Sequence, residues 1–188
     1  MDLSKIQFCV FGFFKCPCVF KMMGLLSLAT FYSTLSYNLL RNRALPFKWM
    51  MNELIDKEHI GGVVCLTEPH EIEHRWAAAK DDWEARGVSY FWLPIRDFWY
   101  STSLENVREA VKFIEECEQS GKKVYVHCKA GRSRSAMIVM CYLMQKHGWY
   151  STAAHALLKS KRPRIVLWHD HWLTIEHYAK TFVWGLMD

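Results

Sequence analysis

Three short apolar runs divide the chain from residue 60 onward, and polar loops or amphipathic segments separate them. The runs are rich in β-branched and aromatic residues and are bounded by turn-forming or charged residues, a pattern typical of buried strands. They are Gly61–Leu66, Val88–Leu93 and Lys123–His127. The polar loops Thr67–His70 and Pro94–Tyr100 follow the first two runs.

The segments before, between and after these runs show helical periodicity. The predicted helices are a short one around Lys48–Asp56, Glu71–Arg86 before Gly87, a helix that Thr102 and Glu105 open as a capping box and Gly121 ends, Ala136–Met144, Ser151–Lys161 and Leu167–Val183. Because Ala136–Met144 is apolar on nearly every side, we expect it to be the buried central helix. Strands that alternate with helices predict an α/β fold with a central, mainly parallel sheet flanked by helices.

Residues 1–43 differ from the remainder of the chain. They contain five basic residues and one acidic residue, and no charge interrupts Met22–Leu40. Serine, threonine, tyrosine and asparagine make that stretch only modestly apolar. Three interpretations remain open: a mitochondrial targeting or matrix-face anchor segment, a secretory signal or membrane span, and a buried helix of the domain. We therefore divide the chain into a targeting or anchor segment, 1–43, and one domain, 44–188.

Composition narrows the functional classes. The formal net charge of +5 suits an acidic ligand or an anionic surface without requiring either, and no nucleic-acid partner is expected. Seven cysteines, odd in number and unevenly spaced, argue against a disulfide framework and for a reducing compartment. The glycine-rich motifs for nucleotides are absent, and His169, His171 and His177 lack convergent partners at a metal-binding spacing. The prediction is that the protein uses no cofactor and no metal.

The strongest chemical signal is the loop that follows the run Lys123–His127. It reads Cys128-Lys-Ala-Gly-Arg-Ser-Arg134-Ser135, so five residues separate a cysteine from an arginine that opens a helix. Such a loop can turn its backbone N–H groups of residues 129–134 inward as an anion nest at a helix N-terminus. Arg134 adds a planar fork for two phosphate oxygens, and Gly131 allows close backbone approach. We expect Cys128 to be a thiolate nucleophile beneath a bound phosphoryl group.

Two other interpretations of Cys128 are weaker. A small buried residue at a strand end would leave the glycine, the arginine spacing and the flanking elements unexplained. A rhodanese-type sulfur-transfer loop also places a cysteine after a strand. Arg134 and Ser135 at this spacing favour phosphate over sulfane sulfur.

Cleavage of a phosphate ester also needs a proton for the leaving oxygen. Asp97 lies directly after a predicted strand and upstream of the nucleophile, so we expect it to be the general acid and then the base that activates water; Glu68 and Glu71 are the alternatives. Ser135 is expected to hydrogen-bond the thiolate and help it leave. His127 either orders the loop or is a core histidine.

The rim of the loop is positively charged. Lys129 and Arg132 favour a polyanionic or strongly acidic head group over a lone phosphotyrosine. The loop residues that we expect to bind phosphate are Lys129, Ala130, Gly131, Arg132, Ser133 and Arg134.

Together these residues resemble the cysteine-dependent protein-tyrosine-phosphatase superfamily. The loop His127–Ser135 is similar to that of the mitochondrial, dual-specificity-type members that act on phosphatidylglycerophosphate, and the similarity runs from about Ile60 to the C-terminus. The resemblance implies Cys128 as nucleophile, Arg134 as phosphate ligand and Asp97 as general acid.

The resemblance also implies a biological setting. Members of this group convert phosphatidylglycerophosphate, an anionic phospholipid, to phosphatidylglycerol, the precursor of cardiolipin. It implies that residues 1–43 hold the enzyme at the matrix side of the mitochondrial inner membrane; another intracellular membrane remains the alternative. Two other functions stay open: a dual-specificity protein phosphatase, and a catalytically weak isoform that acts as a membrane-anchored binding protein. Protein partners are unknown.

One departure from the family pattern concerns a strand. Ala44-Leu45-Pro46-Phe47 is similar to the end of a strand that precedes Gly62 in the family, but Arg41-Asn42-Arg43 stands where the body of that strand should be. We therefore expect the fold to lack one N-terminal strand. The strand that leads into Cys128 would then have an uncovered edge.

Overall fold

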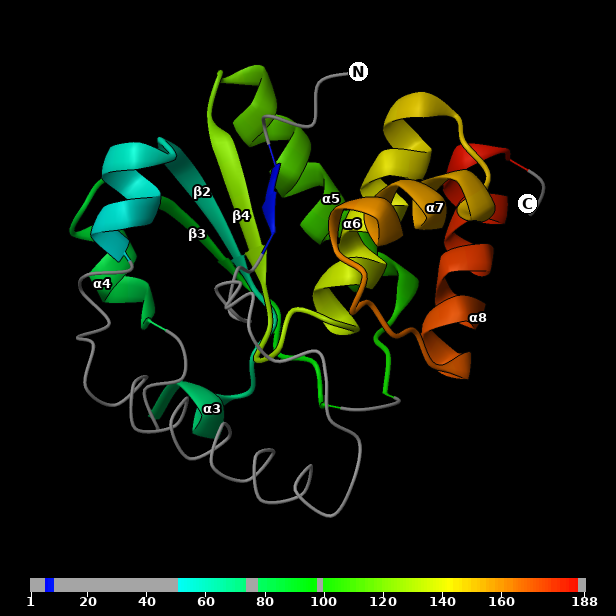
Figure 1. Cartoon of the computed structure of the whole chain (residues 1–188), viewed down its shortest axis with the longest axis horizontal. Coiled ribbons are helices and arrows are strands. Elements are labelled where there is room, and N and C mark those ends of the chain that lie inside the picture. Colours follow the sequence, from blue (N-terminus) through cyan, green and yellow to red (C-terminus); the bar gives the residue numbers. More distant parts are fainter. Residues whose placement is uncertain (1–5, 9–50, 74–77, 98–99, 186–188) are drawn as a thin grey trace, which may run out of the picture.

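The computed structural model describes residues 6–8, 51–73, 78–97 and 100–185. Its centre is a four-stranded parallel sheet in the order β1-β4-β2-β3. The strands are β1 (Ile6–Phe8), β2 (Ile60–Cys65), β3 (Ser89–Trp92) and β4 (Lys123–His127). Helices lie on both faces of this sheet (Figure 1). The α/β fold with a mainly parallel sheet is thus confirmed.

The two faces of the sheet bury different side chains because successive residues of a strand point to opposite sides. Val64 of β2 and Val124 and Val126 of β4 join the larger core. Val63 of β2 and Tyr125 of β4 face the smaller core on the other side.

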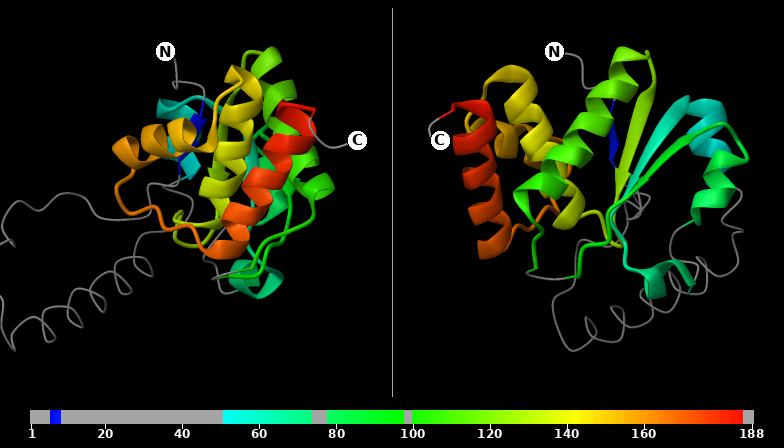
Figure 2. Two further views of the ribbon diagram at one scale, coloured as in Figure 1. Left: turned by 90° about the vertical axis from the view of Figure 1, so that its right-hand side faces the viewer. Right: turned by 180° about the vertical axis from the view of Figure 1, so that it is seen from behind.

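The larger core lies under the C-terminal helices. They are α5 (Leu104–Gln119), α6 (Arg134–His147), α7 (Ser151–Lys161) and α8 (His169–Tyr178), which continues into the π-helical turn η2 (Ala179–Val183). Every residue of α6 from Arg134 to Met144 is buried, and α5, α7 and α8 all pack against it. Figure 2 shows these helices gathered on one side of the sheet. The expected buried central helix is α6.

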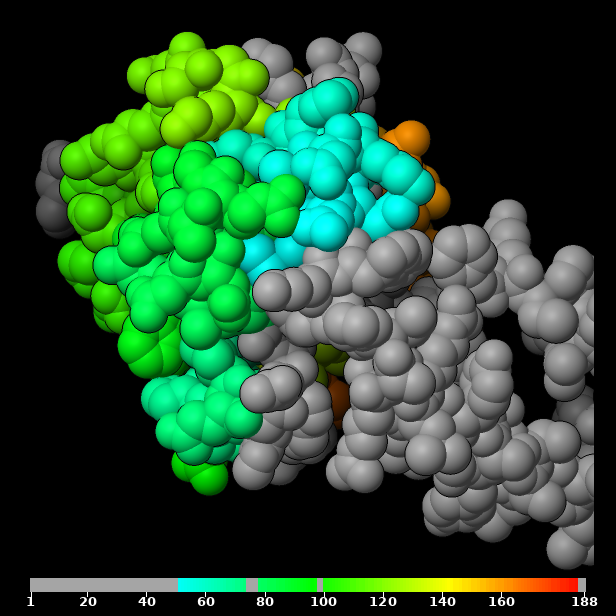
Figure 3. Space-filling view, turned by 90° about the vertical axis from the view of Figure 1, so that its left-hand side faces the viewer, coloured from blue at the N-terminus to red at the C-terminus, as the bar shows by residue number. Residues whose placement is uncertain are grey.

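The opposite face carries shorter elements. They are the π-helical turn η1 (Glu53–Lys57), α3 (Pro69–Glu73) and α4 (Lys80–Glu84). Figure 3 shows this face, with the cyan residues around η1 beside the green residues that include α4. Trp83 of α4 is fully buried and its ring lies 6.3 Å from that of Tyr125, which anchors α4 to the sheet.

Three local expectations need correction. The helix predicted over Glu71–Arg86 is not continuous, since α3 ends at Glu73 and residues 78 and 79 are not helical. The cap of α5 is Ser103, whose Oγ accepts the N–H of Asn106, while Thr102 instead accepts from the Asn106 side chain. Asp82 accepts the N–H of Ala79 at 3.3 Å, which caps a separate helix that begins at Lys80, and two neighbouring hydroxyls share the N–H groups of Asn106. Periodicity encodes neither of these side-chain contacts.

The third correction concerns the edge of β4. The sequence led us to expect this edge to be bare, but β1 pairs with it in parallel, with Ile6, Gln7 and Phe8 opposite Val124, Tyr125 and Val126. A strand from the far N-terminus therefore covers the edge beside the loop that follows β4. The rest of the predicted segment 1–43 lies outside the described residues. Within the described part of the chain, no helix is both long and apolar enough to cross a membrane.

Candidate active site

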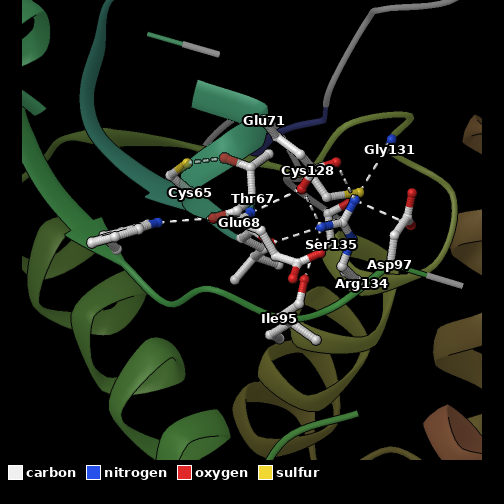
Figure 4. Close-up of polar contacts among 12 residues, drawn as sticks. Cys65, Thr67, Glu68, Glu71, Ile95, Asp97, Cys128, Gly131, Arg134 and Ser135 are labelled. Carbon is white, nitrogen blue, oxygen red and sulfur yellow. Dashed lines mark hydrogen bonds and ion pairs between the residues drawn. The ribbon is translucent and has the colours of Figure 1, made fainter. Parts of the chain in front are cut away.

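The loop Cys128–Ser133 connects β4 to α6 at the carboxyl edge of the sheet, where ligands of parallel sheets bind (Figure 4). Cys128 is buried, and its Sγ accepts the backbone N–H of Gly131 at 3.2 Å. Gly131 has a φ of 61°, the left-handed region in which glycine carries no Cβ penalty. The Oγ of Ser135 lies 3.5 Å from the Cys128 sulfur. The sulfur thus faces one amide and one hydroxyl, both of which stabilise negative charge.

Arg134 begins α6 and is fully buried beneath this loop. Its Nη1 donates to the carbonyl oxygens of Leu66 at 3.1 Å and Ile95 at 2.8 Å. Leu66 follows β2 and Ile95 follows β3. The guanidinium of Arg134 therefore links the carboxyl ends of β2 and β3 to α6, the helix that follows β4. The Nε of Arg134 has no hydrogen-bond partner among the described residues. A buried donor of this kind fits an anion, because leaving it unpaired costs about 1–3 kcal/mol.

Glu71 on α3 holds the same guanidinium from the other side. Its Oε2 accepts from Nη1 of Arg134 at 2.8 Å and its Oε1 accepts from Nη2 at 3.1 Å, a two-pronged contact between side chains that are each 1% exposed. Burial acts to raise the pKa of Glu71, but the hydrogen bonds from Arg134 and from the Glu68 N–H, with the charges of Arg134 and Lys129, lower that pKa below its ordinary value. Glu71 is therefore an ionised anchor, which makes it a poor proton donor.

Asp97 reaches the site from the loop after β3. Its Oδ1 lies 3.1 Å from Nη2 of Arg134, and its side chain is 35% exposed. Figure 4 shows Glu71 and Asp97 around the guanidinium of Arg134. The structure brings together Cys128, Arg134, Ser135 and Asp97, the four residues that the sequence nominated for catalysis.

The other predicted phosphate-binding residues form the rim and the walls of the loop. Lys129, Ala130 and Arg132 are exposed, and Ser133 is half-buried at the start of α6. The segment after α7 supports this loop: Arg162 donates to the carbonyl of Ala130 at 2.9 Å, and the N–H of Val166 donates to the carbonyl of Arg132 at 3.2 Å.

Sequence reasoning missed the anchoring role of Glu71. It placed Glu71 at the start of a helix and considered it only as an alternative acid. Its position directly after the polar exit loop of a strand was the available signal, because such loops meet at the carboxyl edge of a parallel sheet. The support from Arg162 and Val166 had no sequence signal.

A cavity of about 330 Å³ opens beside Arg134. Its lining comprises Glu68, His70, Glu71, Arg96, Asp97, Tyr100 and Lys129. The described residues contain no group of three or more histidine, cysteine, aspartate or glutamate side chains that could hold a metal ion. His127 is buried outside this lining, with its ring stacked 5.0 Å from that of Tyr125.

Known phosphatases are similar to this chain in sequence. Residues 54–181 match the model of the dual specificity phosphatase catalytic domain. Phosphatidylglycerophosphate phosphatase PTPMT1 of Arabidopsis thaliana is 31% identical over 174 residues, which cover 84% of this chain and 50% of that relative. This chain thus spans about half the length of that relative. The Homo sapiens phosphatidylglycerophosphatase and protein-tyrosine phosphatase 1 is 32% identical over 139 residues, 63% of this chain and 69% of the human one.

Solved structures agree with the sequence comparison. The crystal structure of PTPMT1 in complex with PI(5)P superimposes with a TM-score of 0.69 at 30% identity, covering 76% of this chain and 91% of that one. The region that matches the family model, residues 54–181, contains strands β2, β3 and β4, the loop Cys128–Ser133 and Arg134. The chain belongs to the dual specificity phosphatase catalytic domain family, within the cysteine-dependent phosphatases.

Proposed function

We propose that the protein hydrolyses phosphate monoesters through a phospho-cysteine on Cys128. The observation that carries this proposal is the position of Arg134, buried beneath the loop with its Nε unpaired among the described residues, next to a sulfur that accepts the Gly131 N–H. A backbone N–H at the sulfur, a buried guanidinium and a cysteine in one loop suit a phosphoryl group better than any neutral ligand.

Two displacements complete the reaction in this proposal. The Cys128 thiolate forms a bond to phosphorus, the ester P–O bond breaks, and Asp97 gives its proton to the departing oxygen. Asp97, now a carboxylate, then takes a proton from water as the water oxygen attacks phosphorus. The S–P bond breaks, inorganic phosphate leaves, and the hydroxyl of Ser135 donates to the departing thiolate. Arg134 neutralises the phosphoryl oxygens in both steps.

We further propose that the physiological substrate is phosphatidylglycerophosphate, which this reaction converts to phosphatidylglycerol for cardiolipin synthesis. The Arabidopsis and human relatives are phosphatidylglycerophosphate phosphatases by name, which supports this substrate, and the exposed Lys129 and Arg132 suit an anionic phospholipid. In this proposal residues 1–43 direct the protein to the matrix side of the mitochondrial inner membrane. The pairing of Ile6–Phe8 with β4 favours a segment that is retained rather than cleaved.

The competing substrate class is phosphoprotein, because a dual specificity protein phosphatase of Arabidopsis thaliana is 51% identical over 55 residues. The deciding experiment measures phosphate release from phosphatidylglycerophosphate in mixed micelles, beside phosphoinositides and phosphotyrosine and phosphothreonine peptides. Cys128→Ser protein is the control for each substrate. A preference of at least tenfold in kcat/KM for phosphatidylglycerophosphate supports the proposal, and a preference for the peptides contradicts it.

A further inference from the structure

The cavity beside Arg134 adjoins the proposed phosphoryl site, because Glu71 and Asp97 of its lining both contact Arg134. At about 330 Å³ it falls in the lower range of small-molecule sites. It can therefore hold the part of the substrate that lies next to the reacting phosphate. The side chains there include two cations, Arg96 and Lys129.

Charge distinguishes the two parts of the cavity. Of its three carboxylates, Glu71 binds Arg134 through both oxygens and Asp97 lies against the same guanidinium. In the proposed reaction Asp97 carries the proton for the leaving group. The two cations of the lining, Arg96 and Lys129, are both exposed and suit a further anionic group of the substrate next to the reacting phosphate.

Arg96 is fixed in place by its neighbours in the chain. The carbonyl of Ile95 accepts from Arg134 at 2.8 Å, and the carboxylate of Asp97 lies 3.1 Å from the same guanidinium. The backbone of Arg96 is thereby held from both sides at the carboxyl edge of the sheet. Its side chain is exposed, and its guanidinium carbon lies 4.4 Å from the ring centroid of Tyr100.

Stacking on Tyr100 prepares Arg96 to bind an anion. An aromatic face holds the guanidinium plane while the N–H edges stay available, so less conformational freedom is lost when an oxyanion is bound. The planar fork matches two oxygens of one phosphate group. Lys129, which directly follows Cys128 in the chain, adds a second charge from the other catalytic loop.

We propose that Arg96, supported by Lys129, is a subsite for a second phosphate, a phosphodiester one short polyol away from the phosphomonoester that reacts at Cys128. The inference rests on the proposed phosphatase function and names the substrate feature that this site selects: a lipid head group with both a monoester and a diester, as in phosphatidylglycerophosphate. The diester carries its negative charge on two oxygens, which the planar fork of Arg96 can bind together.

The test compares two water-soluble substrates that share the alkyl monoester: deacylated phosphatidylglycerophosphate, which carries the diester, and glycerol 1-phosphate, which lacks it. We expect Arg96→Met to lower the ratio of their kcat/KM values by roughly ten- to hundredfold, the loss of a charge-assisted two-pronged contact. Arg96→Lys should restore only part of the ratio, since an ammonium lacks the fork. Arg86→Met is the matched control, because Arg86 is an exposed arginine that binds Asn52 and Asp56 instead.

Binding measurements separate this inference from the proposed function. Calorimetry with Cys128→Ser protein compares the Kd of the same two compounds with and without Arg96→Met, and it requires no turnover. An unchanged ratio in both the kinetic and the binding series overturns the subsite. Activity that survives Cys128→Ser would contradict the phospho-cysteine mechanism. The subsite at Arg96 would then be judged from the Kd values alone. A melting temperature of Arg96→Met equal to that of the Arg86→Met control shows that the fold is intact.

Discussion

Replacing Glu71 by glutamine tests whether this buried carboxylate holds Arg134 in place. The substitution keeps the shape of the side chain but removes the charge opposite a fully buried guanidinium. Removing one partner of a buried ion pair costs about 3–5 kcal/mol. The carbonyls of Leu66 and Ile95 and the carboxylate of Asp97 still contact Arg134, so we expect a loss near the lower end, about 3 kcal/mol.

Thermal and denaturant unfolding measure this loss directly. For a chain of 188 residues, each kcal/mol shifts the melting temperature by about 2–4 °C, so Glu71→Gln should melt about 6–12 °C below the unmodified protein. Glu68→Gln is the matched control, because Glu68 contacts the pair through its backbone N–H, which the substitution retains. The kcat/KM for an aryl phosphate should fall in Glu71→Gln as well, because the guanidinium loses its orientation. Equal melting temperatures of the two variants would refute the anchoring role.

The pH dependence of the stability difference between the unmodified protein and Glu71→Gln gives a second check. The pKa of Glu71 is lowered in the folded protein, so its contribution is fully present above the unfolded value of about 4.3 and is lost as pH falls through the folded value. The stability gap between the unmodified protein and Glu71→Gln should stay constant near neutral pH and shrink below about pH 4.3. A gap that widens with acid would contradict the assigned sign.

Three further predictions concern the reaction itself. Cys128→Ser should abolish turnover while retaining substrate binding, and activity above about a thousandth of the unmodified rate would exclude a cysteine nucleophile. Arg134→Lys should lower both affinity and kcat, because an ammonium cannot make the two-pronged contact; near-normal kinetics would remove Arg134 from the site. Asp97→Asn should slow alkyl phosphates by roughly a hundred- to ten-thousandfold and aryl phosphates much less, with the alkaline fall of the pH–rate profile lost. Equal losses on both substrates would shift the acid role to Glu68.

Local rules account for the predicted site residues that the structure brings together. The spacing from Cys128 to Arg134 determines a loop of one size, and the apolar runs on either side determine the strand and the helix that carry it. Asp97 was found by the same reasoning, because a residue that follows a parallel strand must lie at its carboxyl edge. These inferences need only neighbouring residues and the geometry of one strand or helix.

Contacts between distant segments were beyond such reasoning. Glu71 lies 63 residues before Arg134, and nothing in either local pattern indicates their two-pronged contact. The orientation of Arg96 over Tyr100 likewise depends on how Arg134 holds both flanking residues.

The sequence by itself determined the residue types and spacing of the loop after β4 and the alternation of strands and helices, since both follow from short-range spacing and periodicity. Only the tertiary structure decided which strand lies beside β4 and which carboxylate holds Arg134. Three residues of β1 provide too little periodicity to predict a strand, and they pair because the exposed N–H and C=O groups of β4 need partners. Likewise, Glu71 meets Arg134 because the carboxyl ends of the parallel strands converge at one edge and a buried guanidinium requires a buried anion.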